Sequence, residues 1–98
     1  MNKAITTEEF AFYLRIDVVD DTITQELERL ILRAQGVCED FCRVTFDETA
    51  PEAVKLAVTL LASHYHAYRE GSDATAERTI RTAAENLLWP HRDPDKMF

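Results

Sequence analysis

From near the start of the chain, apolar residues recur every three or four positions, which is the spacing of an amphipathic helix. The segment ITTEEFAFYLRID opens with the capping box Thr6–Glu9, in which each side chain can bond the backbone N–H of the other residue. Apolar residues then recur at helical intervals, so we expect a short helix that ends near Arg15. Its apolar positions are Phe10, Tyr13 and Leu14.

A longer amphipathic helix is predicted next, from a second capping box at Thr22–Gln25 to about Cys42. Its apolar residues recur at i, i+3 and i+4 and form one stripe, while charged residues tend to the other side. Gly36 costs this helix about 1 kcal/mol relative to alanine, and we expect it to permit close packing. The stripe consists of Ile23, Leu27, Leu30, Ile31, Ala34, Cys38 and Phe41.

The segment 43–50, RVTFDETA, alternates Val44 and Phe46 with polar residues. Such alternation fits a short strand, but a strand needs a partner and the chain offers no second good strand. We therefore expect a structured loop that holds Val44 and Phe46 against the core. The alternative is a strand that pairs with a neighbouring subunit.

A third helix is predicted to begin at Pro51, because proline suits the first helical position, and no helix breaker follows before Gly71. Apolar residues cover more than half of its circumference. We expect this helix to be central in its domain or to be covered further by a partner. One face carries Val54, Ala57, Val58, Leu61, Tyr65 and Tyr68, and the flank carries Ala53, Leu56, Leu60 and Ala67.

A final helix is predicted from about Asp73, which can cap it, to Trp89, and Pro90 stops it. Its apolar side consists of Ile80, Ala83, Ala84, Leu87 and Leu88. The fold class is therefore all-α, a small bundle of about four helices. The expected organisation is one domain over 1–90 and a polar tail over 91–98.

Composition supports a globular protein with a single modest core, because 98 residues are too few for two domains. The net charge is −7, and residues 1–50 hold 5 basic against 11 acidic residues, a balance of −6. Repulsion from phosphates argues against nucleic-acid binding by that half. No apolar run approaches the ~20 residues that span a bilayer, and the N-terminus has no signal-peptide core, so we expect no membrane association and a place in the cytosol.

The spacing of the cysteines and histidines does not fit a metal site or a catalytic site. Cys38 and Cys42 share a helix face but lack two further metal ligands, so we expect them to be buried as small hydrophobic residues. His64 and His66 lie about 160° apart around a helix and cannot hold one ion together. No nucleophile motif or phosphate-binding glycine loop is present. We expect no catalytic site, no metal and no cofactor, and therefore no enzyme.

The short helix of ITTEEFAFYLRID is followed by DD, the long amphipathic helix, PEAVKLAVTLLASHYHAYRE and a closing LLWPHR. Over nearly the whole chain, this order resembles the small head–tail connector (adaptor) proteins of tailed bacteriophages and prophages. The chain departs from the family at the end of the second helix, where a "tGR"-like motif is reduced to Arg43, and over residues 71–85, which look more helical than the usual loop. The matching residues are Thr7, Glu8, Leu14, Arg15, Asp17, Asp21, Ile23, Leu27, Ala34, Phe41, Pro51, Val54, Lys55, Ala57, Leu60, Leu61, His64, Tyr65, Arg69, Leu87, Leu88, Pro90 and Arg92.

The resemblance implies an all-α subunit that forms a homo-oligomeric ring at the head–tail junction of the virion, after a period in the cytoplasm of the bacterial host. The ring would bind the portal protein on one side and tail-completion proteins on the other. DNA would pass through its channel without sequence-specific binding. Since aromatic residues and arginine are enriched at interfaces, our candidate contact residues are His64, Tyr68, Arg69, Trp89 and Arg92.

A second hypothesis is a small acidic helical module that binds a partner helix in a groove and acts as a monomer or dimer. Oligomeric state separates the two hypotheses, because a connector should form rings and a binding module should not.

Overall fold

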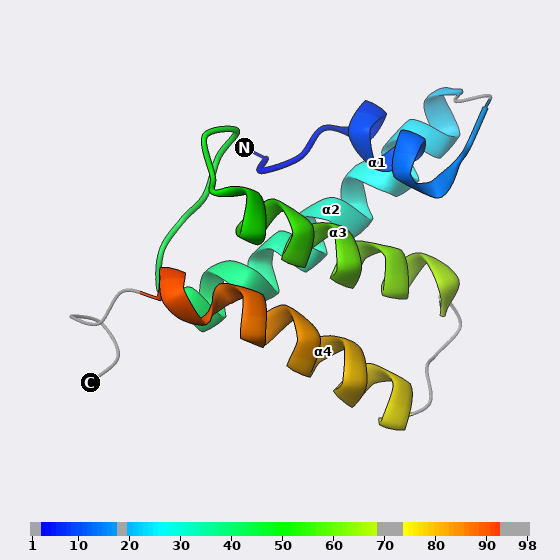
Figure 1. Ribbon diagram of the computed structural model, residues 1–98. Coiled ribbons are helices and arrows are strands. Elements are labelled where there is room, and N and C mark those ends of the chain that lie inside the picture. Colours follow the sequence, from blue (N-terminus) through cyan, green and yellow to red (C-terminus); the bar gives the residue numbers. More distant parts are fainter. Residues whose placement is uncertain (1–2, 18–19, 69–73, 93–98) are drawn as a thin grey trace.

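The computed structural model describes residues 3–17, 20–68 and 74–92. Within these ranges it contains four α-helices, one 3₁₀ turn and no strand, which confirms the all-α bundle expected from the sequence. Helix α3 packs against both α2 and α4, and α1 packs mainly against α2 (Figure 1). The elements are α1 (Thr7–Leu14), α2 (Asp21–Cys42), α3 (Glu52–Ala67), α4 (Ala74–Leu88) and the 3₁₀ turn η1 (Trp89–His91).

The hydrophobic core lies where α3 is enclosed between α2 and α4, and α1 adds its apolar face to it. Helix α3 is thus the central helix, as its wide apolar surface predicts. Each large side chain that is fully buried stabilises the fold by roughly 1.5–3 kcal/mol. The largest of these are Phe10, Leu27, Ile31, Leu61, Leu88, Val54 and Val58.

The first two helices begin at polar caps, one of which differs from the prediction. In α1, Thr6 Oγ1 accepts from the Glu9 N–H and Glu9 Oε1 accepts from the Thr6 N–H, both at 3.0 Å, so the predicted capping box is confirmed. In α2, Asp20 is the N-cap and its Oδ1 accepts from the Ile23 N–H at 2.8 Å. The prediction of a cap at Thr22 is wrong, because the Asp20 carboxylate accepts from the Ile23 N–H in the first turn and its negative charge is stabilised by the positive end of the helix dipole.

The same two helices end on arginines in the left-handed conformation. Arg15 and Arg43 each have φ of 61°, in a region that L-residues seldom adopt. The residues that follow them, Ile16 and Val44, donate their backbone N–H to the carbonyl five residues back, at 3.0 and 3.3 Å. Both of these side chains also pack on the core. This combination of a left-handed residue and an apolar contact is a common way to satisfy the last carbonyls of a helix.

Segment 43–50 is a loop, as predicted, and a glutamine of α2 holds it in place. Gln35 is buried, and its Oε1 accepts from the Ala4 N–H at 2.7 Å. Its Nε2 donates to the Phe46 carbonyl at 3.1 Å and to Glu39 Oε2 at 3.2 Å. Glu39 Oε2 also accepts from the Phe46 N–H at 2.8 Å. These bonds satisfy the backbone of Phe46 without a partner strand, and they join the N-terminal segment, α2 and the loop.

Two helix boundaries near prolines and glycines differ from the predictions. Pro51 is the N-cap of α3, one residue before the helix begins. The helix ends at Ala67 because Tyr68 leaves the helical conformation at φ −119° and ψ 49°. It therefore stops short of Gly71, which lies outside the described residues.

The predicted close packing at Gly36 is wrong, since this residue is exposed and no heavy atom lies within 4 Å of where its Cβ would be.

The C-terminal end of the described chain is folded through Arg92. Trp89, predicted to end α4, instead begins the η1 turn with Pro90 and His91, and the Arg92 N–H donates to the Trp89 carbonyl at 3.4 Å. Residues 93–98 of the predicted tail, and Asp73, the predicted cap of α4, lie outside the described residues.

Candidate interaction surfaces

His64, the first of the predicted contact residues, lies inside the subunit. It is only 8% exposed, and its ring lies 5.9 Å from that of Tyr65 and 4.8 Å from that of Tyr68. The Arg33 guanidinium covers the outer face of this cluster, 4.0 Å from the centre of the Tyr65 ring. His64 therefore offers a partner little surface of its own, while Tyr68, at 45% exposed, offers more. Arg69, also predicted as a contact residue, lies outside the described residues.

Trp89 and Arg92, the other two predicted contact residues, come together at the end of α4. The Arg92 guanidinium lies 4.3 Å from the Trp89 ring and 4.8 Å from the Phe41 ring, and the two rings lie 6.4 Å apart at a tilt of 49°. Trp89 is 64% exposed. We call Phe41, Trp89 and Arg92 the aromatic knob. Cation–π contacts of this kind contribute about 0.5–1 kcal/mol each at exposed sites, so they favour this arrangement of the tryptophan.

The arginine of the aromatic knob has spare hydrogen-bonding capacity. Arg92 Nε is buried with no hydrogen-bond partner, and no ion pair joins the guanidinium to a carboxylate among residues 3–17, 20–68 and 74–92. A positive charge at an exposed aromatic surface is the composition that protein interfaces favour.

The buried cysteines lie beneath this end of the molecule. Cys38 and Cys42 are both free and buried, which confirms their predicted role as core residues, and Cys42 Sγ donates to the Leu88 carbonyl at 3.8 Å. Burial raises the pKa of the Cys38 thiol to about 12. Burial also raises the pKa of Cys42, although the nearby Arg92 charge opposes that shift. Both thiols are therefore protonated at neutral pH, so neither supplies the nucleophilic thiolate.

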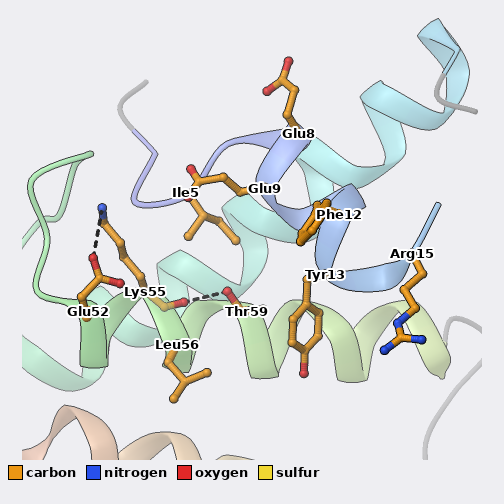
Figure 2. Close-up of a pocket in the computed structure, with 10 residues that line it drawn as sticks. All are labelled: Ile5, Glu8, Glu9, Phe12, Tyr13, Arg15, Glu52, Lys55, Leu56 and Thr59. Carbon is orange, nitrogen blue, oxygen red and sulfur yellow. Dashed lines mark hydrogen bonds and ion pairs between the residues drawn. The ribbon is translucent and has the colours of Figure 1, made fainter. Parts of the chain in front are cut away.

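A second surface lies between α1 and α3. Because α1 packs mainly against α2, part of α3 is left uncovered. Figure 2 shows Phe12 on α1 above α3 and the ring of Tyr13 reaching from α1 across α3, which carries Leu56 and Thr59. Phe12 is 86% exposed, Tyr13 49% and Leu56 46%. The hollow measures about 840 Å³. We call it the α1–α3 groove, and it is lined by Ile5, Glu8, Glu9, Phe12, Tyr13, Arg15, Glu52, Lys55, Leu56 and Thr59.

Charged side chains surround this apolar floor. Glu8, Glu9 and Glu52 contribute three carboxylates, against the cations of Arg15 and Lys55. The Lys55 ammonium lies 4.0 Å from a Glu52 carboxylate oxygen, a loose exposed pair. Backbone hydrogen bonding holds the pKa of Glu8 below its ordinary value, so this carboxylate is charged at neutral pH. The charged groups around the groove are thus acidic in balance, beside the exposed rings of Phe12 and Tyr13.

The sequence indicated part of this groove and missed part of it. The excess apolar surface predicted for α3 includes Leu56, which is the residue left exposed. The sequence did not indicate that Phe12 and Tyr13 line a groove: Tyr13 is among the apolar positions predicted for the first helix, and Phe12 is not. The available signal was FAFYL, since one short helix cannot bury three aromatic residues on one face.

The described residues contain neither a candidate metal site nor a membrane-spanning helix. No three or more His, Cys, Asp or Glu residues there gather closely enough to hold a metal ion. None of the helices in the described ranges combines the length and apolarity needed to cross a bilayer. Comparison of the chain with protein-family models, with curated proteins and with solved structures found no match.

Proposed function

We propose that this protein is a structural subunit that forms a ring at the head–tail junction of a tailed bacteriophage or prophage. The ring docks on the portal protein, receives tail-completion proteins and leaves a channel for DNA. The observation that carries the proposal is the exposed α1–α3 groove, in which Phe12, Tyr13 and Leu56 face solvent in a small acidic subunit.

An exposed aromatic surface of this kind supports assembly. Contiguous apolar patches on small proteins mark contacts with other molecules, because leaving them in water is unfavourable. A ring repeats one heterologous contact, so each subunit needs two different surfaces. The α1–α3 groove and the aromatic knob share no residue and lie on different helices. The resemblance of the sequence to connector proteins supplies the biological setting.

The charge of the chain supports the channel. A net charge of −7, concentrated in residues 1–50, repels phosphate groups. A ring built from such subunits lets DNA pass without holding it.

Native mass spectrometry over a rising concentration series, with and without the portal protein of the same phage genome, tests this function. We expect a closed oligomer of many subunits, with no ladder of open intermediates, either alone or on the portal. A stable dimer, or a monomer that ignores the portal, would contradict the proposal. It would favour the binding-module hypothesis, for which the α1–α3 groove would hold an amphipathic helix of a partner.

A further inference from the structure

The two surfaces of the subunit suit each other in form, because one exposes a large aromatic side chain and the other is an open hollow. The aromatic knob carries Trp89, whose indole is 64% exposed. The α1–α3 groove is an open hollow of about 840 Å³. An indole and a guanidinium together fit within such a volume.

The two surfaces are also complementary in charge. Arg92 brings a cation without an ion-pair partner among the described residues. The rim of the groove brings the carboxylates of Glu8, Glu9 and Glu52 against the cations of Arg15 and Lys55, so its balance is acidic by one charge. Exposed carboxylates beside an aromatic floor suit a guanidinium that lies against an indole, because the ring stacks on the floor while the cation meets the rim.

We propose that the aromatic knob of one copy of this chain inserts into the α1–α3 groove of the next copy. Trp89 lies against Phe12 and Leu56, and the Arg92 guanidinium pairs with carboxylates of the rim. The inference rests on the proposed function in one respect, since the next copy is the neighbour in the ring.

One knob-to-groove contact between two copies leaves one groove and one knob unused. These can meet each other in a closed reciprocal dimer, or each can contact a further copy. In the second case each copy uses its knob toward one neighbour and its groove toward the other, which is the heterologous contact that closes a ring or extends a filament. Tryptophan and arginine are the residues that most often dominate binding energy at interfaces. We therefore expect Trp89 and Arg92 to account for most of the affinity.

Mixing two variants tests the pairing directly. Trp89→Glu removes the knob and keeps the groove, and Phe12→Glu removes the groove and keeps the knob. Each variant alone should be monomeric, with the dissociation constant for self-association raised at least about 30-fold. The mixture should give 1:1 heterodimers and nothing larger, because only one intact knob and one intact groove remain. Thr82→Glu, an exposed change on α4 outside both surfaces, should assemble like the wild type.

Folding and alternative contacts are controlled in the same experiment. Both replaced residues are exposed, so circular dichroism should show unchanged helix content. Arg92→Glu and Leu56→Glu form a second pair that should reproduce the result. Assembly by Trp89→Glu or Phe12→Glu alone at wild-type concentration would overturn the inference, as would a mixture that yields no heterodimer.

A separate portal-binding measurement distinguishes failure of this contact from failure of the proposed function. A wild-type chain that binds portal but never pairs through the knob and the groove overturns the inference and leaves the connector function standing. A chain that forms the 1:1 heterodimer but ignores portal supports the inference and contradicts the function.

Discussion

Replacing Gln35 with leucine removes the side chain that joins three segments of the protein. The change keeps the approximate size of the residue but deletes its acceptor for the Ala4 N–H and its donor to the Phe46 carbonyl and to Glu39. The Ala4 amide is buried, so water cannot replace the lost acceptor without opening the N-terminal segment.

The expected cost follows from these partners. A buried N–H left without an acceptor costs about 1–3 kcal/mol, and each partly buried hydrogen bond that is lost costs about 0.5–1.5 kcal/mol. Burial of the leucine side chain offsets part of this sum. We expect the free energy of unfolding to fall by about 2–4 kcal/mol. This is a large share of the roughly 5–15 kcal/mol typical of a domain, and it corresponds to a fall in Tm of about 10–25 °C.

Urea unfolding followed by circular dichroism measures this loss. Gln25→Leu, an exposed change on the same helix, is the matched control and should stay within about 0.5 kcal/mol of the wild type. Amide hydrogen exchange should also show Ala4 and Phe46 losing protection together in Gln35→Leu. A loss of stability no larger than that of Gln25→Leu would refute the reasoning, because the Gln35 bonds would then contribute nothing that water does not supply.

Replacing Gln35 with glutamate distinguishes the contribution of the Gln35 acceptor oxygen from that of its donor nitrogen. Gln35→Glu keeps an acceptor for the Ala4 N–H, loses the donor to the Phe46 carbonyl and places a carboxylate beside Glu39. Burial and the neighbouring charge raise the pKa of the new carboxyl above its ordinary value of about 4.3. The penalty relative to the wild type is therefore present at neutral pH and shrinks as the pH falls and the group is protonated.

Three further changes test other features of the fold. Gly36→Ala should raise the free energy of unfolding by about 0.5–1 kcal/mol in urea titrations, since the added methyl group meets open space on an exposed helix face; a loss would contradict the open environment. Asp20→Ala should lower stability by about 1 kcal/mol while Thr22→Ala stays within about 0.5 kcal/mol, and the reverse order would restore the cap at Thr22. The raised pKa of Cys38 makes the free energy of unfolding fall as the pH rises from 9 toward 12, because the thiol ionises earlier in the unfolded chain. This thiol contributes up to about 1.4 kcal/mol per pH unit. Cys38→Ala should lack that contribution when thermal unfolding is measured over this pH range.

Local patterns in the sequence predicted most of the helices because their signals act over a few residues. The Thr6–Glu9 box and the Pro90 stop each satisfy or block backbone groups in their immediate vicinity, and both features have the expected effect. The start of α2 was misplaced because Asp20 and Thr22 both offer a capping oxygen. The choice between them depends on how the chain enters the helix.

The candidate surfaces depended more on tertiary packing. Trp89 and Arg92 were named as contact residues from residue type alone, which determines neither the exposure of the indole nor the stacking of the guanidinium. The α1–α3 groove exists because α1 packs mainly on α2, and spacing within α1 does not determine which neighbour it meets. For the same reason His64 looked available from its residue type although it packs inside the subunit.

The left-handed arginines at the ends of α1 and α2 are strained, so the stability of the fold can be raised at these two positions. The chain has only 2 glycines, and neither stands at Arg15 or Arg43, where an L-residue costs about 1–2 kcal/mol in this conformation. Glycine at both positions would release most of this strain, less its own greater entropy loss on folding. A version engineered for heat resistance would begin at these two turns. It would carry a net charge of −9 in place of −7, and would exchange two surface cations for thermal tolerance.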